Sequence, residues 1–140
     1  MMTRATTPAK RKPRASGARR RTASIAIKRV YDGASAADGV RIIIDRLWPR
    51  GLSKAALKFD AWPRELAPSN DLRKWYGHVP ERFAEFRRRY RDELAAHRDE
   101  LAALRLMIKG RPATLLTATR EVELSHAQVL REMLQGKGRR

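Results

Sequence analysis

The sequence predicts a single α/β domain, in which a small mixed or parallel sheet is flanked by helices. Two short apolar runs, 40–44 and 113–118, have the composition of strands that are buried on both faces. Between these runs, apolar residues recur at every third or fourth position from Phe83 to Ile108, which is the spacing of helices that bury one face. A chain of 140 residues is long enough for one domain with a modest core.

Basic residues concentrate at the two ends of the chain, which has a net charge of +17. Residues 1–23 contribute +8 without any acidic side chain and residues 137–140 contribute +3, which leaves +6 for the domain at 24–136. The first segment lacks the apolar side chains that a core requires, so we expect a disordered basic tail. Such a tail either only aids solubility or binds nucleic acid weakly and without sequence preference.

The composition also excludes several classes of protein. There are no cysteines, so disulfides, thiolate metal ligands and a cysteine nucleophile are excluded. No apolar run is long enough to span a membrane, and no segment has the apolar centre of a secretory signal. We therefore expect a cytoplasmic protein with no membrane partner, no metal and no other cofactor.

Three strands are predicted in the first half of the chain. Residues 25–31 alternate between apolar and polar side chains and predict a strand near an edge of the sheet. The run 40–44 ends in consecutive isoleucines and predicts an inner strand. Residues 58–62 predict a short strand, because Pro63 and Pro68 prevent a long helix in this region.

Helices are predicted from residue 70 onward. Ser69 is placed to cap a short helix, 70–76, which Gly77 ends. Pro80 then opens the long helical pattern, which predicts either one helix or two helices in line before Pro112.

One flank of this helical segment is basic. At about 100° per residue, four arginines fall on the same side: Arg87, Arg91, Arg98 and Arg105. Such a stripe could follow a phosphate backbone. Charges on an exposed helix are more often solvated or paired with a carboxylate four residues away, and the lack of interleaved aromatic residues favours that interpretation.

The last predicted elements bring a histidine toward the end of a strand. The run 113–118 predicts a second buried strand, and Ser125 with Gln128 has the spacing of a capping box for the final helix. His126 falls in the first turn of that helix, where free N–H groups and the helix dipole favour an anion. If the strands at 40–44 and 113–118 are parallel, His126 lies near the residues that follow 40–44.

The segment that follows 40–44 is the main candidate site. It reads Asp45-Arg46-Leu47-Trp48-Pro49-Arg50-Gly51 and comes at the end of a strand, where ligands usually bind in open α/β sheets. A proline and a glycine stiffen and turn the loop on either side of Arg50. Two arginines on a rigid loop suit a phosphate or carboxylate. The alternative is a structural pair between Asp45 and an arginine, with Trp48 covering the core.

Several short motifs are shared with a known family. They are KRVYD at 28–32, DRLWPRG at 45–51, ELAPS at 65–69, LRKW at 72–75, TLL at 114–116 and SHA at 125–127. On these motifs the chain resembles, from Ile27 to Leu134, the YeaO-like family, a bacterial domain of unknown function with the number 488. The resemblance implies a compact α/β domain and no established reaction.

The resemblance also bears on chemistry. A related branch of the superfamily has cysteines at two positions that correspond here to Thr117 and Ser125, while the histidine remains as His126. Thiol or metal chemistry of that branch is therefore not expected in this chain.

Together, these features favour an anion-binding pocket built on the DRLWPRG loop. We expect the ligand to be bound by six residues: Arg29, Tyr31, Arg46, Trp48, Arg50 and Ser69. Asp45 and His126 are candidate acid–base residues for hydrolase or transferase chemistry on a phosphorylated or nucleotide-like ligand, although no nucleophile is evident. The alternative function is association with nucleic acid through the basic tail and the arginine flank. The sequence leaves open whether the protein is an enzyme and what its oligomeric state is.

Overall fold

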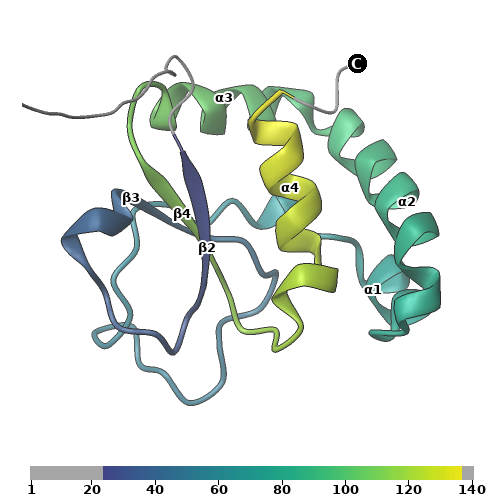
Figure 1. Ribbon diagram of the computed structural model, residues 1–140, viewed down its shortest axis with the longest axis horizontal. Helices are drawn as coiled ribbons and strands as arrows, with labels where there is room; N and C mark the ends of the chain where they lie inside the picture. Colours follow the sequence, from purple (N-terminus) through teal and green to yellow (C-terminus); the bar gives the residue numbers. More distant parts are fainter. Residues whose placement is uncertain (1–23, 137–140) are drawn as a thin grey trace, which may run out of the picture.

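The computed structural model describes residues 24–136, so the tails at 1–23 and 137–140 lie outside the described residues. Three strands form one sheet: β2 (Ile25–Arg29), β3 (Val40–Ile43) and β4 (Ala113–Thr117). Their order is β2-β4-β3, and both pairs are parallel (Figure 1). The predicted α/β class with a small, parallel sheet is confirmed.

The strand β4 occupies the centre of this sheet and is buried along its whole length. The prediction that 40–44 forms an inner strand is wrong, because β3 lies at an edge. That edge is covered by the chain at 58–61, where Ile43 N donates to Ala61 O at 2.9 Å and Asp60 N donates to Arg41 O at 2.7 Å. An edge strand covered in this way is as buried as an inner one. The predicted strand at 58–62 is reduced to a single bridge between Ile42 and Ala61.

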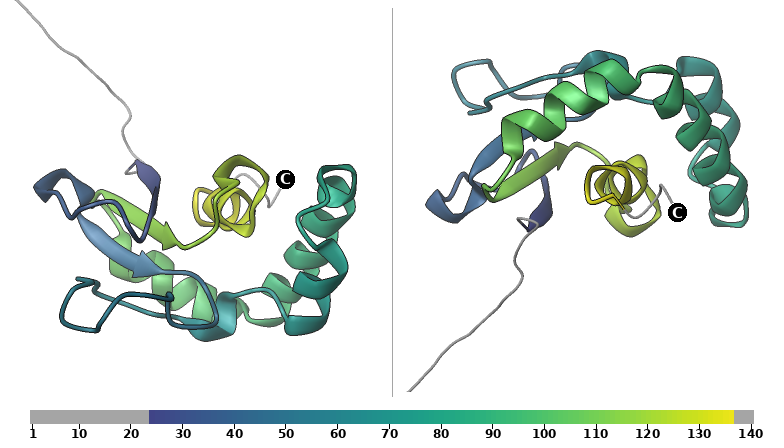
Figure 2. Two further views of the ribbon diagram at one scale, coloured as in Figure 1. Left: turned by 90° about the horizontal axis from the view of Figure 1, so that it is seen from below. Right: turned by 90° about the horizontal axis from the view of Figure 1, so that it is seen from above.

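Within residues 24–136, four α-helices surround the sheet: α1 (Asn70–Tyr76), α2 (Phe83–Ala96), α3 (Arg98–Ile108) and α4 (His126–Leu134). Short 3-10 helices stand at Ala36–Asp38, Arg64–Leu66, Pro80–Arg82 and Val122–Leu124. Figure 2 shows α3 and α4 on opposite faces of the sheet, with α2 on the far side of α4. No helix of the described chain is long and apolar enough to cross a membrane.

The long helical pattern forms two helices that are not in line. The backbone leaves the helical region at His97, with φ −113° and ψ 39°, and α3 then runs across the molecule at a large angle to α2 (Figure 1). The predicted apolar face is nevertheless buried: Phe86, Tyr90, Leu94, Leu101, Leu104 and Ile108.

The helix caps follow the prediction with one exception. The Ser69 hydroxyl accepts from Leu72 N at 3.1 Å, and Gly77 ends α1 in the left-handed region. Ser125 caps α4 by accepting from Ala127 N at 3.1 Å. The predicted capping box does not form, because the Gln128 side chain accepts from Arg131 instead, at 2.8 Å.

Two apolar clusters hold the domain together. The larger one joins the sheet to the helices and includes the residues of the α2 and α3 faces. The smaller one consists of Val30, Ile43, Leu57 and Leu116, with Trp48 and Trp62 packed against it. Because Trp48 belongs to the DRLWPRG loop, this smaller cluster holds the loop against the domain.

Candidate functional site

A cleft of about 370 Å³ opens at the carboxyl ends of β3 and β4. Because the two strands are parallel, with Ile43 beside Leu116, the chain leaves both at the same edge of the sheet. Asp45 follows β3, Thr117 ends β4 and His126 begins α4, and all three line the cleft. The position is the one that open α/β sheets commonly use for ligands.

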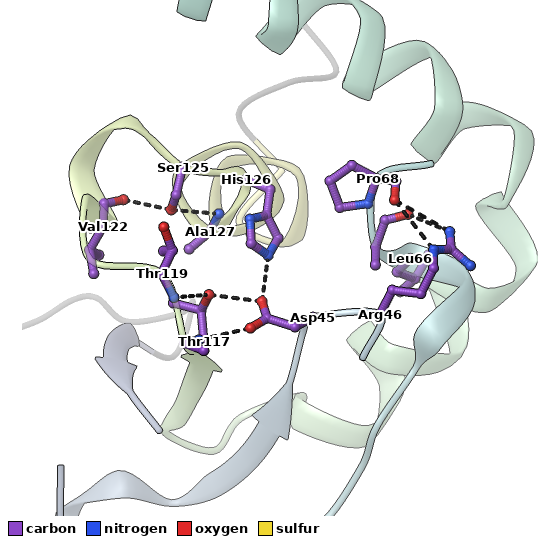
Figure 3. Close-up of polar contacts among 12 residues, drawn as sticks. Asp45, Arg46, Leu66, Pro68, Thr117, Thr119, Val122, Ser125, His126 and Ala127 are labelled. Carbon is purple, nitrogen blue, oxygen red and sulfur yellow. Dashed lines mark hydrogen bonds and ion pairs between the residues drawn. The ribbon is translucent and has the colours of Figure 1, made fainter. Parts of the chain in front are cut away.

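The carboxylate of Asp45 accepts three hydrogen bonds (Figure 3). Oδ1 lies 2.8 Å from His126 Nε2 and 2.8 Å from the Thr117 hydroxyl, while Oδ2 accepts from Ala118 N at 2.8 Å. The backbone oxygen of Asp45 accepts from the Trp62 indole at 2.7 Å. This carboxylate therefore orients the imidazole of His126, and it pairs with no arginine of the described residues.

Two opposing effects set the pKa of Asp45. Burial raises the pKa, but the hydrogen bond and charge of His126, together with the Ala118 and Thr117 donors, bring it below the ordinary value of 3.8. The carboxylate is thus ionised at neutral pH and can only accept hydrogen bonds, so His126 carries a proton on Nε2. Nδ1 of His126 makes no hydrogen bond to the described residues and is not buried, so it is available to a ligand.

Arg46 extends away from Asp45, toward the chain at 66–68 (Figure 3). Its guanidinium donates to the backbone oxygens of Ala67, at 3.1 Å, and Pro68, at 3.4 Å. Carbonyl partners orient the guanidinium without cancelling its charge. Arg73 also lines the cleft and likewise has an uncharged partner, because it donates to the side-chain oxygen of Asn70 at 3.2 Å.

Arg50 stands on a loop that is fixed at both sides. The Tyr31 hydroxyl donates to Arg50 O at 3.0 Å, the Trp48 indole donates to Leu52 O at 2.6 Å, and Gly51 takes a φ of 86°. The Arg50 guanidinium itself has no hydrogen bond or ion pair within residues 24–136. The alternative of a structural Asp45–Arg50 pair is therefore not what the structure contains.

The two predicted aromatic walls differ in their surroundings. Trp48 packs edge-on against Phe59 and Trp62, with ring centroids 5.8 and 5.5 Å apart. Tyr31 is 45% exposed, and the guanidinium of Arg29 lies 4.9 Å from its ring centroid. Both rings line the cleft.

Two of the predicted ligand-binding residues do not line the cleft. Arg29 donates to the backbone oxygens of Ala118 and Thr119, at 3.2 and 3.1 Å. Ser69 caps α1, and its hydroxyl also donates to Glu93 at 2.6 Å. Arg29 thus holds two lining residues in place from outside the cleft, and Ser69 holds the start of α1.

Several lining residues besides Arg73 were not predicted as site residues, and they include Tyr76, His78, Phe86 and Thr119. Tyr76 and Phe86 stack with centroids 4.5 Å apart and form an apolar floor. His78 is the one non-glycine residue of the described chain with positive φ, at 60°, a conformation that tends to persist at functional sites. The Thr119 hydroxyl is buried without a hydrogen-bond partner among the described residues. The helical spacing of Phe86 indicated only a core position, and no sequence signal marked Tyr76 or Thr119.

The predicted arginine flank is divided by the bend at His97. Arg87 forms an ion pair with Glu132, and Arg105 donates to Met133 O at 2.6 Å, so both contact α4. Within residues 24–136 no group of three or more histidine, aspartate or glutamate side chains is placed to hold a metal ion.

Residues 24–140 match the model of the family described as the inactive DUF488-N3 subclade. The uncharacterized protein YeaO of Escherichia coli (strain K12) is 44% identical over 112 residues, which cover 79% of this chain and 96% of YeaO. The uncharacterized protein Rv3073c of Mycobacterium tuberculosis (strain ATCC 25618 / H37Rv) is 42% identical over 117 residues, which cover 84% of this chain and 98% of that protein. No solved structure matched the chain. The chain therefore belongs to the YeaO-like DUF488 family, as its motifs predicted.

Proposed function

We propose that the cleft binds a small organic anion, such as a phosphate ester or a carboxylate, without covalent chemistry. One observation carries the proposal: three guanidinium groups line the cleft, and none has a carboxylate partner among the described residues. These groups belong to Arg46, Arg50 and Arg73. The lining carboxylate, Asp45, already has its oxygens occupied by hydrogen bonds from Thr117 and Ala118 and by the contact with His126. An excess of positive charge in a concave site with fixed donors suits an anion.

The proposal of binding without covalent chemistry rests on the hydroxyl groups of the cleft. The Thr117 hydroxyl donates to Asp45 at 2.8 Å, and the Ser125 hydroxyl donates to Val122 O at 2.7 Å while capping α4. The partner of Thr117 is a carboxylate whose pKa is lowered, and the partner of Ser125 is a backbone oxygen, so neither hydroxyl has the strong base that nucleophilic catalysis requires. The description of the matching family as inactive supports the same proposal. His126 would donate to the anion through Nδ1 only as the imidazolium, in which both ring nitrogens carry a proton.

The experiment is a titration with inorganic phosphate and with ribose 5-phosphate, followed by the melting temperature. A ligand present at about 100 times its Kd stabilises a protein by about 2.7 kcal/mol, which raises the melting temperature by several degrees. We expect this rise in the wild type and its loss in Arg50→Ala. The substitution should change the free energy of unfolding by less than about 0.5 kcal/mol, because the guanidinium has no internal partner.

Two further variants sharpen the result. Arg98→Ala removes an equal charge from an exposed position outside the cleft and should respond to the anions as the wild type does. Arg50→Lys keeps the charge but lacks the planar pair of donors, so we expect normal folding and weak binding. The proposal is wrong if the wild type shows no stabilisation, or if Arg50→Ala and Arg98→Ala respond equally.

A further inference from the structure

We infer that the anion of the cleft is a phosphate group on an aromatic molecule of the nucleoside monophosphate type, whose ring stacks on Tyr31. This inference rests on the proposed function, because the arginines of the cleft would hold the phosphate. The volume of about 370 Å³ falls within the range of about 300–1,000 Å³ in which proteins enclose small organic molecules. A bare oxyanion would leave most of that volume unfilled, and three guanidinium groups favour a dianion over a carboxylate.

The ring of Tyr31 is fixed in place although it is not buried. It is 45% exposed, yet its hydroxyl donates to Arg50 O at 3.0 Å and its ring lies 4.9 Å from the guanidinium of Arg29. An exposed ring contributes little to the core, and a ring that is already held loses little conformational entropy when a ligand binds. An exposed ring that is already held in place is suited to stack on the ring of a ligand.

Arg29 determines which face of the ring is open. Its guanidinium is anchored by the backbone oxygens of Ala118 and Thr119, at 3.2 and 3.1 Å, and so cannot easily leave the ring. One face of Tyr31 is therefore occupied by a cation, and the other face is left for a planar ligand. The position of Arg29 behind the ring also adds positive charge near the cleft.

The other large aromatic residues of the cleft are already packed. Trp48 packs against Phe59 and Trp62, and its indole N–H donates a hydrogen bond to Leu52 O. Tyr76 and Phe86 are only 5% and 2% exposed. Tyr31 is thus the lining tyrosine, tryptophan or phenylalanine with a large exposed surface in the described chain.

The ring and the anion donors are neighbours. The Tyr31 hydroxyl donates a hydrogen bond to the backbone oxygen of Arg50, whose guanidinium is free. The ring of Tyr31 therefore lies next to Arg50. A molecule with a ring and a phosphate on a short linker can use both at once. A sugar phosphate can use only the guanidinium, and a nucleoside can use only the ring.

The test compares four compounds by calorimetry on the full-length protein: adenosine 5′-monophosphate, phenyl phosphate, ribose 5-phosphate and adenosine. We expect at least one of the aromatic phosphates to bind about tenfold more tightly than ribose 5-phosphate, the gain that one stacked ring typically provides. Tyr31→Leu should remove that gain and should weaken ribose 5-phosphate no more than Tyr31→Phe does, because both variants lack the hydroxyl bond to Arg50 O. Tyr31→Phe retains the ring and should bind within about threefold of the wild type, which controls for loss of the hydroxyl bond to Arg50 O.

The outcomes separate this inference from the proposed function. If ribose 5-phosphate binds as tightly as both aromatic phosphates, the stacking inference is overturned while anion binding stands. If no phosphate compound binds the wild type, both are overturned. If Tyr31→Leu weakens ribose 5-phosphate as much as the aromatic phosphates, Tyr31 acts only by positioning Arg50, and the stacking inference is again overturned. Melting temperatures of the two variants verify that each is folded.

Discussion

His126 and Asp45 are joined by a contact of 2.8 Å between Nε2 and Oδ1, although 81 positions separate them in the chain. The contact ties the start of α4 to the loop that leaves β3. The two side chains are 15% and 19% exposed, so water screens the interaction only in part. It is both a brace of the fold and the feature that turns the imidazole toward the cleft.

Loss of the Asp45 carboxylate should destabilise the domain. Asp45→Ala leaves the donors of His126, Thr117 and Ala118 without their acceptor, and we expect a loss of about 3 kcal/mol at pH 7, measured by urea unfolding. Because the folded pKa of Asp45 lies below 3.8, the unfolded state binds more protons as the solution is acidified. The contribution of Asp45 is thus complete above about pH 5 and disappears as the pH falls through the folded pKa.

The same dependence on pH provides the control. Asp45→Asn removes the titrating group and should lose stability less steeply than the wild type below pH 4. Asp92→Asn alters a carboxylate that is 74% exposed and should retain the wild-type acid profile. Equal acid profiles for the wild type and Asp45→Asn would contradict the assigned pairing.

Gly39 is expected to tolerate no side chain. It has a φ of 65°, and an added Cβ would lie 2.0 Å from Pro112 O, which is itself held by a hydrogen bond from Val40 N. We expect Gly39→Ala to cost at least about 2 kcal/mol in chemical denaturation. Gly33→Ala is the matched control, since its Cβ would meet no atom within 4 Å, and it should stay within about 0.5 kcal/mol of the wild type.

Ser69 should matter for stability and not for binding. Its N–H and hydroxyl both donate to Glu93, at 2.8 and 2.6 Å, and its hydroxyl accepts from Leu72 N. Ser69→Ala should cost about 1–2 kcal/mol of folding free energy. A double-mutant cycle with Glu93→Ala should give a coupling energy of about 0.5–3 kcal/mol, while phosphate affinity remains that of the wild type. A coupling energy of zero, or a loss of phosphate binding, would refute this assignment.

Tyr90 should contribute through its hydroxyl. It is fully buried and donates to Leu66 O at 2.5 Å, and burial holds its pKa well above 10. Tyr90→Phe leaves that carbonyl without a donor and should lower the free energy of unfolding by about 1–2 kcal/mol. Tyr31→Phe alters an exposed ring and should have less than half that effect on thermal unfolding. Similar losses in both variants would show that the Leu66 bond is dispensable.

Local patterns were sufficient to predict most of the elements. The caps at Ser69 and Ser125, the buried faces of α2 and α3 and the buried strands β3 and β4 depend on residue types in local patterns, which the sequence displays directly. The edge position of β3 and the bend at His97 depend on contacts between distant segments. An apolar run is expected whether β3 is covered by another strand or by the chain at 58–61, so the sequence cannot distinguish the two. The bend at His97 has no glycine or proline to mark it.

The candidate site divides in the same way. Asp45, Arg46, Arg50 and His126 line one cleft because parallel strands end at one edge, a rule that can be applied before any coordinates are known. Arg73 and His78 come to the cleft through the packing of α1, which no motif encodes. Arg29 was predicted to bind the ligand; it does not line the cleft itself, but it contacts three residues that do, Tyr31, Ala118 and Thr119.

The strand order β2-β4-β3 has a consequence for the nascent chain. The two strands that are synthesised first do not pair with each other, since the strand that separates them ends only at Thr117. Sheet formation must therefore wait until nearly the whole domain has left the ribosome, and the histidine of the cleft follows nine residues later. A chain that stops before residue 113 would have neither a sheet nor a site.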